Sequence, residues 1–394
     1  MRLPILLMII FLLLNGVVDY YLYKLIKYKG KNKIWAKSYA LFSIIVAIAI
    51  IGIISLPRRT GSDDTLYFIM YGLVSYFSIY LPKYVYIIID LIAKIPLLFR
   101  RKRWKYISRL GIIVAIIAFI SMWWGVYNRN NIEEKYVDVE IIALPKAFDG
   151  YRIAQISDLH VGSYNKDTTF VAKLVERLNL LNVDAVVFTG DIVNRNSAEL
   201  LPFVKTLSRI KTKDGVFSVL GNHDYGDYSD WESDSAKQAN MQLMYDLQKQ
   251  MNWRLLLNEY ITIFRDKDSI AVIGVENLGD PPFKNYGSLE KADSLIDRSI
   301  TKILLSHNPA HWDQQIKDDK EINIALTLSG HTHAMQMELF GISPAVFRYK
   351  HWGGLYIDSL QQKLYVNTGV GTVAMPMRIG ATPEITILTL RANK

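Results

Sequence analysis

The sequence predicts a chain of two parts: a bundle of about four transmembrane helices in residues 1–130 and an α/β domain in residues 131–394. Four long apolar stretches predict the first part. Short apolar runs that alternate with helical patterns predict the second part, and the closer spacing of its later runs suits two packed sheets with outer helices. Polar motifs at the ends of these runs predict a functional site.

The composition limits the classes of chemistry that the chain can perform. Its 394 residues include no cysteine, which excludes disulfides, zinc–thiolate sites and thiol nucleophiles. The formal net charge of +9 is uneven, because residues 1–130 hold 18 Lys+Arg against 4 Asp+Glu and the remainder holds 28 against 33. The basic charge therefore belongs to the membrane part, and no nucleic-acid partner is expected for the α/β domain.

The apolar stretches near the N-terminus are long enough to cross a bilayer and lack the polar stripe of a soluble amphipathic helix. The first is unlike a signal peptide, because its apolar core is long and three more stretches follow it. The third is interrupted by polar residues, so it is one long tilted helix or a span followed by an interfacial helix. The stretches are Leu3–Leu25, Trp35–Leu56, Leu66–Phe99 and Ile107–Tyr127.

The short connections predict orientation, because cytoplasmic loops of membrane proteins carry an excess of Lys and Arg. The first and third connections are basic, whereas Arg58 and Arg59 in the second are balanced by Asp63 and Asp64. The basic residues are Lys27, Lys29, Lys31 and Lys33, then Arg100, Arg101, Lys102, Arg103, Lys105 and Arg109. We expect an integral protein of the bacterial inner (cell) membrane, with the α/β domain on the periplasmic or extracellular side of the lipid bilayer.

The α/β domain follows a short polar linker, and its first segment, Tyr136–Leu144, alternates like a strand. Further strands are predicted at Arg152–Ser157, Ala185–Thr189, Val216–Leu220, Ile270–Val275, Lys302–Ser306, Ile324–Ser329, Lys363–Asn367 and Ile385–Leu390. Helices are predicted at Thr168–Leu181, Ala198–Ile210, Ser235–Met251 and Leu289–Ser299.

Five polar motifs each stand at the end of an apolar run. In the first, Asp158 and His160 are two residues apart, and in extended chain such residues point to the same side and can reach one metal ion. The others are Gly190-Asp191, Gly221-Asn222-His223-Asp224, Ser306-His307 and Gly330-His331-Thr332-His333. Because ligands of α/β sheets gather at the carboxyl ends of strands, these motifs predict one shared site.

The donors in these motifs are oxygen and nitrogen atoms without sulfur, which suits Mn, Fe, Zn or Ni. They are Asp158, His160, Asp191, Asn222, His307, His331 and His333. Seven ligands are too many for one ion, but two divalent ions about 3.5–4 Å apart would use them all if one carboxylate bridged. Gly190 and Gly221 would let the backbone approach the ions, and Gly330 would permit a tight turn.

Each motif alone has an ordinary structural explanation. Gly, Asn and Asp favour turns, and Asn308 before Pro309 is typical of a helix start. His311 and His351 stand outside the motifs and are interpreted as structural or pocket-edge residues. Five such motifs in one chain, each at a predicted strand end, favour a metal site.

With these motifs in order, residues 150–390 resemble the calcineurin-like metallophosphoesterase superfamily, and the whole chain resembles its membrane-anchored branch of YkuE-like and YaeI-like phosphoesterases. The resemblance implies a four-layer α/β/β/α sandwich with a dinuclear metal site. It assigns Asp158, His160, Asp191 and His333 to one metal, and Asp191, Asn222, His307 and His331 to the other. It also implies that His223 donates a proton to the leaving oxygen and that Asp224 positions His223.

The resemblance extends to the tail, in Asn367-Thr-Gly-Val-Gly371, Arg378 and Pro383-Glu384-Ile385. One departure concerns the rim of the site. The branch often has Gly-Gly after the Gly-His-Thr-His motif, whereas this chain has Ala334 and Met335 before Gln336. We therefore expect the same ligands within a bulkier and more apolar pocket.

The expected function is hydrolysis of a phosphodiester, phosphomonoester or pyrophosphate bond, and the membrane location favours a lipid-linked substrate. One alternative is a catalytically inactive membrane receptor or scaffold, against which the complete ligand set argues. The other is a transporter with a regulatory domain. Only Asp19 and Asp90 offer intramembrane carboxylates for a transport path, and the stretches contain no cluster of charges.

Overall fold

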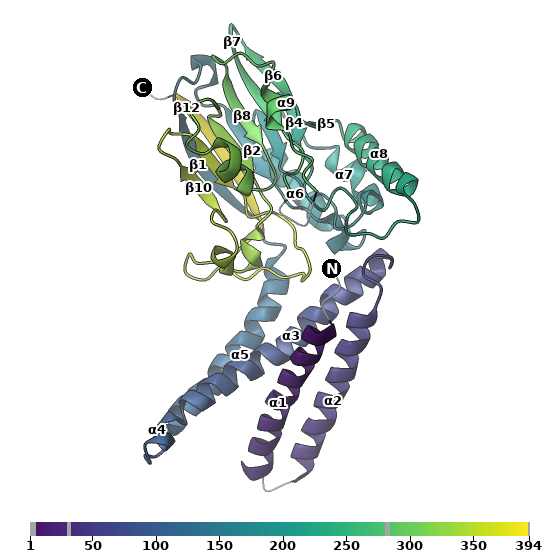
Figure 1. The fold of residues 1–394 in the computed structure, drawn as a ribbon, viewed down its shortest axis with the longest axis vertical. Helices are drawn as coiled ribbons and strands as arrows, with labels where there is room; N and C mark the ends of the chain where they lie inside the picture. The colour runs from purple at the N-terminus through teal and green to yellow at the C-terminus, as the bar shows by residue number, and fades with distance from the viewer. Residues whose placement is uncertain (1–4, 30–32, 280–283, 393–394) are drawn as a thin grey trace. The chain divides into compact units, whose positions relative to one another are not determined.

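The computed structural model describes residues 5–29, 33–279 and 284–392 (Figure 1). Leu3 and Pro4 of the first predicted stretch and Lys31 of the first basic connection lie outside the described residues. The chain forms two compact units. The helical unit contains Met1–Pro57 and Phe68–Val126, and the sheet unit contains Arg58–Tyr67 and Tyr127–Lys394.

The long helices of the N-terminal region follow the predicted apolar stretches. They are α1 (Ile5–Lys29), α2 (Lys33–Ser55), α3 (Asp63–Ile92), the short α4 (Ile95–Leu98) and α5 (Lys105–Asn128). Among the described residues, α2 and α5 are long and apolar enough to cross a membrane by length and composition alone. The third stretch is one 30-residue helix that continues through Pro82, followed by the separate α4.

Both intramembrane carboxylates of the helical unit have cationic partners. Asp19 accepts hydrogen bonds from Lys83 Nζ at 2.7 Å and from Tyr80 Oη at 2.7 Å. Asp90 is fully buried and accepts from Arg103 Nη2 at 2.6 Å. A buried carboxylate that is paired with a cation is compensated within the helix bundle. These pairs support a structural role for Asp19 and Asp90.

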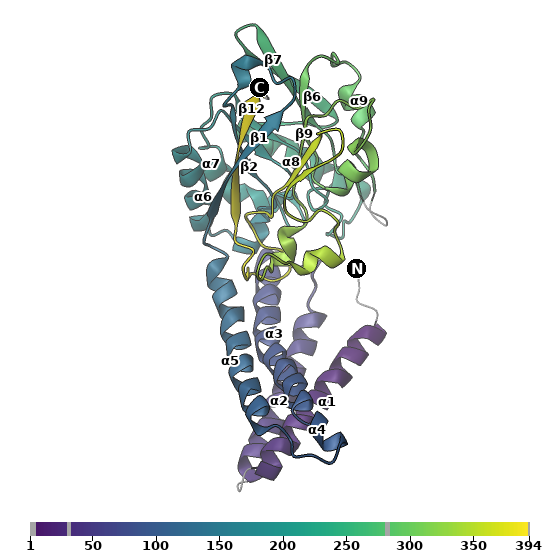
Figure 2. The same ribbon diagram turned by 90° about the vertical axis from the view of Figure 1, so that its left-hand side faces the viewer.

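The sheet unit contains two six-stranded sheets (Figures 1 and 2). The first has the order β1-β12-β2-β3-β4-β5, with β2 to β5 parallel. Its strands are β1 (Glu133–Ile141), β12 (Glu384–Ala392), β2 (Arg152–Ile156), β3 (Ala185–Phe188), β4 (Gly215–Ser218) and β5 (Trp253–Leu255).

The second sheet has the order β10-β11-β9-β8-β7-β6, with four parallel strands between two antiparallel edge strands. Its strands are β10 (Gly354–Ile357), β11 (Lys363–Val366), β9 (Leu326–Ser329), β8 (Thr301–Leu305), β7 (Asp268–Gly274) and β6 (Glu259–Arg265).

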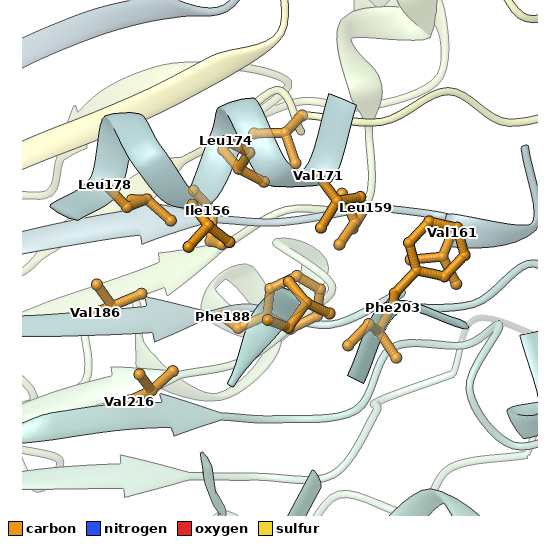
Figure 3. Close-up of a cluster of buried hydrophobic side chains, with 14 of the residues drawn as sticks. Ile156, Leu159, Val161, Val171, Leu174, Leu178, Val186, Phe188, Phe203 and Val216 are labelled. Carbon is orange, nitrogen blue, oxygen red and sulfur yellow. The ribbon is translucent and has the colours of Figure 1, made fainter. Parts of the chain in front are cut away.

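Alternate side chains along the strands point to opposite faces of each sheet, so each sheet packs against the other sheet on one face and against helices on the other. In β3, Val187 packs into the core between the two sheets, whereas Val186 and Phe188 pack on the outer face beneath helices. Figure 3 shows Leu174 of α6 above Val186 and Phe188. The helices on this face are α6 (Thr169–Leu180), α7 (Val204–Leu207) and α8 (Asp234–Gln250), and α9 (Leu289–Asp293) covers the outer face of the second sheet. The α/β/β/α sandwich is confirmed.

The structure contains all eight strands predicted by apolar runs. β1 overlaps the alternating segment Tyr136–Leu144 but begins and ends three residues before it, at Glu133 and Ile141. Three short or half-buried strands, β5, β6 and β10, were not predicted. Two helix predictions were wrong in part. The predicted helix at Leu289–Ser299 ends at Asp293. The predicted helix at Ala198–Ile210 starts as a 3₁₀-helix that contains Pro202 and ends at Phe203, and only Val204–Leu207 is α-helical. Proline lacks the N–H that a regular α-helix needs at that position.

The connection between α2 and α3 packs as part of the sheet unit. The guanidinium of Arg195 donates hydrogen bonds to the carbonyl oxygens of Arg58 at 3.1 Å and Gly61 at 2.8 Å. It also donates to the Asp63 carboxylate at 2.7 Å. The connection and the sheet unit therefore lie in the same compartment.

Replacing Leu174 tests the packing of α6. Leu174 is fully buried, so Leu174→Ala should lower the free energy of unfolding by about 2–5 kcal/mol through lost contacts and a residual cavity. Leu180, on the same helix, is 78% exposed, and Leu180→Ala should change it by less than about 0.5 kcal/mol. Denaturant unfolding followed by circular dichroism measures both. Equal destabilisation by the two variants would contradict this packing.

Candidate metal centre

The seven candidate ligands lie at one edge of the sandwich, at the carboxyl ends of parallel strands. Asp158 and His160 follow β2, and Asp191 and Asn222 follow β3 and β4. In the second sheet, His307 follows β8, and His331 and His333 follow β9. Six of them form two groups, Asp158–His160–His333 and Asp191–His307–His331, in each of which one donor atom per residue lies within 4.8 Å of the others.

In the first group, the imidazole nitrogens point at one another. His333 Nε2 lies 3.1 Å from His160 Nε2 and 3.1 Å from Asp158 Oδ1. The second group is equally compact, because His307 Nε2 lies 3.2 Å from His331 Nδ1 and 3.2 Å from Asn222 Oδ1. The structure thus brings together the side chains of all seven candidate ligands.

Asp191 lies between the two groups. Its Oδ2 atom is 3.3 Å from His307 Nε2 in one group and 3.6 Å from His160 Nε2 in the other. Its Oδ1 atom accepts the backbone N–H of His223 at 2.8 Å. This is the placement that a bridging carboxylate requires.

Backbone carbonyls hold two of the imidazoles in one tautomer. His160 Nδ1 lies 3.1 Å from the Val193 carbonyl oxygen, and His307 Nδ1 lies 2.7 Å from that of Thr189. A carbonyl oxygen only accepts, so Nδ1 carries the hydrogen, and in the neutral ring Nε2 offers its lone pair to the cluster. Metal-binding histidines are usually held in this way, and the donor set fits a borderline divalent ion.

Burial and mutual charge shift the pKa values of the cluster. Burial alone would raise the pKa of Asp191, but the charge of His307 outweighs it and holds that pKa well below its usual value. Burial lowers the pKa of His307, but the negative charge of Asp191 has the larger, opposite effect and raises that pKa to about 9. Burial lowers the pKa of His331 to about 4 and that of His160 well below its usual value. The cluster therefore needs positive charge beside Asp191.

Five of the seven candidate ligands have left-handed backbone. The φ angles are 54° at Asp158, 46° at His160, 60° at Asp191, 74° at His331 and 51° at His333. Residues with a Cβ rarely adopt this conformation, and it gathers at functional sites. Asp158 and His160 were predicted to lie in extended chain, which is wrong, although both side chains do reach the cluster.

Two glycines allow the backbone to pass close to the carboxylates. A Cβ at Gly221 would lie 2.2 Å from Asp191 Oδ1, and one at Gly330 would lie 1.9 Å from Ser157 Oγ and 2.4 Å from Asp158 Oδ2. Gly330 was predicted to permit a tight turn, but its φ angle is not in the positive region that only glycine adopts readily. Close packing against Ser157 and Asp158 is the reason for glycine at this position.

Asp224 organises the loop that carries Asp191. Its carboxylate accepts four backbone N–H groups, from Gly221, Asp191, Ile192 and Val193, at 2.8–3.2 Å. Burial and the charge of Asp191 raise the pKa of Asp224 to about 7. The Asp224 carboxylate therefore fixes both the backbone after β3 and Gly221, two residues before His223.

His223 lines the cavity and is held from two sides. Its Nδ1 donates to the Asn194 carbonyl oxygen at 2.6 Å, and its ring stacks on Tyr228 with 3.9 Å between centroids and 3° between planes. Asn222 Nδ2 donates to Tyr228 Oη at 2.9 Å. Tyr228 thus supports two predicted site residues, yet no motif in the sequence indicates it.

The remaining histidines take structural positions. His311 Nδ1 lies 2.8 Å from Ser306 Oγ, and His351 Nδ1 lies 2.9 Å from Asp313 Oδ2.

Arg378 is fully buried, donates to the Thr368 and Gly371 carbonyl oxygens, and lies 3.3 Å from His333 Nδ1. Arg378 therefore ties the tail of the chain to the cluster.

The cluster opens into a cavity of about 440 Å³. Asp191, Asn222, His223, His331 and His333 line it on one side. The rim combines Tyr228, Tyr349 and Arg348 with the apolar side chains of Met335, Val373, Ala374 and Met375. Met335 therefore makes the rim more apolar, in agreement with the departure seen in the sequence.

The chain is similar in sequence to curated metallophosphoesterases. The chain is 31% identical to an uncharacterized metallophosphoesterase of Helicobacter pylori over 74% of its own length and 72% of that protein. It is 28% identical to one of Campylobacter jejuni over 98% of both chains, and 30% identical to YkuE of Bacillus subtilis over 64% of its own length and 82% of that protein. A zebrafish transmembrane protein with a metallophosphoesterase domain is 30% identical over 72% of this chain and 63% of its own length.

Two family models match the two parts of the chain. Residues 151–335 match "Calcineurin-like phosphoesterase", and residues 1–129 match "Probable Calcineurin-like phosphoesterase, transmembrane domain". The chain therefore belongs to the calcineurin-like phosphoesterases and is a membrane protein. The family resemblance predicted from the five motifs is confirmed.

Replacing Asp224 tests the loop anchor. In Asp224→Asn, one amide oxygen remains as acceptor and the NH₂ group faces backbone donors, so at least some of the four N–H groups lose their partner. The free energy of unfolding should fall by about 1–3 kcal/mol. Hydrogen exchange should accelerate at Asp191, Ile192 and Val193. The exposed Asp246→Asn is the matched control, and equal exchange in both variants would contradict the anchoring role.

Proposed function

We propose that the chain hydrolyses phosphodiester, phosphomonoester or pyrophosphate bonds with two divalent metal ions, drawn from Mn, Fe, Zn or Ni. The main support is the position of the Asp191 carboxylate. Its Oδ2 atom lies within 3.6 Å of an imidazole nitrogen in each of the two groups of candidate ligands. Membership of the phosphoesterase family supports the same reaction class.

The residues of each group would hold one ion. Asp158, His160 and His333 would hold the first, His307, His331 and Asn222 the second, and Asp191 would belong to both. Such a pair of ions, when bound, polarises phosphoryl oxygens and lowers the pKa of water toward neutrality. The donor types and the fixed tautomers of His160 and His307 favour this occupancy over a purely structural role.

His223 is proposed to donate a proton to the leaving oxygen. Its Nδ1–H is held by the Asn194 carbonyl, so Nε2 is the nitrogen left to exchange a proton in the cavity. Hydrolysis breaks the bond between phosphorus and that oxygen, and protonation prevents an alkoxide from having to leave. Stacking on Tyr228 fixes the plane of the ring during the transfer.

A lipid-linked phosphoester or pyrophosphate is the proposed substrate class. Arg348 supplies positive charge at the rim, and Met335, Val373 and Met375 supply apolar surface beside it. A phosphate attached to an acyl or prenyl chain matches both features. A nucleic-acid substrate is not favoured, because acidic residues outnumber basic ones after residue 130.

The sheet unit is proposed to face the periplasm or cell exterior of a bacterial inner membrane. Arg58 and Gly61, in the connection between α2 and α3, pack against Arg195 of the sheet unit. The two basic connections, around Lys27–Lys33 and Arg100–Arg109, would then lie across the membrane from the unit, in the cytoplasm.

Removing the central carboxylate charge tests the shared ligand. Asp191→Asn should lower the metal content of the purified full chain and abolish nearly all turnover of a chromogenic phosphodiester, because an amide bridges two ions poorly. Elemental analysis and steady-state kinetics measure the two effects. Asp246→Asn should match the unchanged chain in both. Full metal content and full turnover in Asp191→Asn would refute the two-ion proposal.

Replacing His223 separates proton transfer from metal binding. His223→Ala keeps the backbone N–H that Asp191 accepts, so both ions should remain. Turnover should fall by about 10²–10⁴-fold, the usual worth of general acid catalysis. The loss should shrink for a substrate whose leaving group has a low pKa, since that group departs without a proton. A uniform loss across leaving groups would exclude proton donation.

A reporter enzyme fused after Lys394 tests the sidedness. A reporter that is active only outside the cytoplasm should be active, because both basic connections favour the cytoplasm. A cytoplasmic reporter at the same position should be silent. The reverse pattern would overturn the proposed orientation and leave the hydrolytic proposal intact.

A further inference from the structure

A segment beside the cavity exposes an unusual amount of apolar surface. Between Met335 and Phe347, six large apolar side chains are exposed: Met335, Leu339, Phe340, Ile342, Val346 and Phe347. Phe340 is 103% exposed and Phe347 is 93% exposed. Elsewhere among the described residues after Asn128, large exposed apolar side chains stand singly along the chain. We call residues 335–347 the apolar rim segment. Contiguous apolar exposure of this kind indicates a contact surface.

The backbone holds this segment in shape. Leu339 and Ile342 exchange two backbone hydrogen bonds, of 2.9 and 3.1 Å, around a two-residue turn. Both central residues have positive φ, 53° at Phe340 and 77° at Gly341. Such turns favour Asn-Gly, and a bulky aromatic residue at the first position is strained. Ser343 Oγ donates to the Ala334 carbonyl oxygen at 2.5 Å and ties the segment to the metal-site loop. The strained turn therefore holds the aromatic ring of Phe340 on the surface.

The segment is joined to the residues at which the last membrane helix ends. Asn128, the final residue of α5, donates to the Arg378 carbonyl oxygen at 3.4 Å. The next residue, Ile379, pairs with Met337, and the N–H of Glu338 donates to its carbonyl oxygen at 2.8 Å. Met337 and Glu338 of the apolar rim segment therefore contact Ile379, whose neighbour Arg378 contacts the last residue of α5.

The second chain connection borders the same cavity. Arg59, between α2 and α3, donates to the carbonyl oxygens of Asp227 at 2.9 Å and Ser229 at 2.8 Å. Tyr228, between those two residues, lines the cavity together with Met335. Both places where the sheet unit continues into membrane helices thus lie at the cavity edge of the sandwich. That edge is the one from which the chain continues into the helical unit in both directions.

From these contacts we infer that the apolar rim segment inserts into the surface of the bilayer in which the chain is anchored. Phe340, Ile342 and Phe347 enter the boundary between headgroups and acyl chains, and the exposed Arg348 meets the phosphates of anionic lipids. Insertion of this segment would give a membrane phosphoester a short path into the cavity of the proposed function.

The absence of native cysteine makes a labelling experiment direct. Phe340→Cys in the full chain carries a single fluorophore and is reconstituted in vesicles of phosphatidylcholine and phosphatidylglycerol. Phe264→Cys is the matched control, because Phe264 is 74% exposed in the β6–β7 hairpin, at the opposite edge of the sheets from the cavity (Figure 1). Thermal unfolding checks that both labelled chains are folded.

Brominated phosphatidylcholine should quench the probe at position 340 by at least about twofold, as expected for a group that reaches the acyl boundary. A water-soluble quencher should reach the probe at 264 and spare the one at 340. Equal access of the water-soluble quencher to both positions would overturn the inference. Protection at 340 that persists in detergent and depends on protein concentration would also overturn it, because a second copy of the chain would then cover the segment.

Discussion

The carboxylate of Asp191 is the feature on which the rest of the site depends. It is 2% exposed, and Asp158, His160 and His307, around it, are fully buried. Ionised groups lose their hydration on burial, so a stable cluster needs compensating charge. Asp224 fixes the backbone of Asp191 through four N–H groups, and Gly221 lets the chain pass its carboxylate oxygen at close range. The two groups of candidate ligands are thus arranged around one carboxylate.

The clustering of the candidate ligands could be predicted from the sequence because each stands at the end of a short apolar run, and parallel strands bring such ends to one edge. The same pattern could not predict how the backbone turns there, since left-handed φ at His160 or His333 depends on contacts between distant segments. Tyr228 was missed for a similar reason. Its role rests on stacking against His223 within a loop that has no periodic pattern. The glycines beside the candidate ligands were noted in the sequence, but Gly330 is required because it packs closely against Ser157 and does not serve a tight turn.

The membrane region was predicted well where length and polarity decide the outcome. Long apolar stretches predicted the long helices, and the polar break at Lys94-Ile95-Pro96 ends α3 and starts α4. The contacts of residues 58–67 with Arg195 and with the loop around Tyr228 could not be predicted, because no local pattern pairs these segments. Through them, the connection between two membrane helices supports a loop that lines the cavity. Membrane anchoring and the geometry of the site are therefore linked within the sheet unit.

Electron paramagnetic resonance of the full chain loaded with Mn²⁺ measures whether Asp191 bridges two ions. If Asp191 bridges two ions about 3.5–4 Å apart, their spins are coupled through the carboxylate, and the spectrum should be that of an exchange-coupled manganese pair. Two equivalents of Mn²⁺ should be needed to develop it fully. A spectrum of isolated Mn²⁺ at every loading would contradict a shared carboxylate.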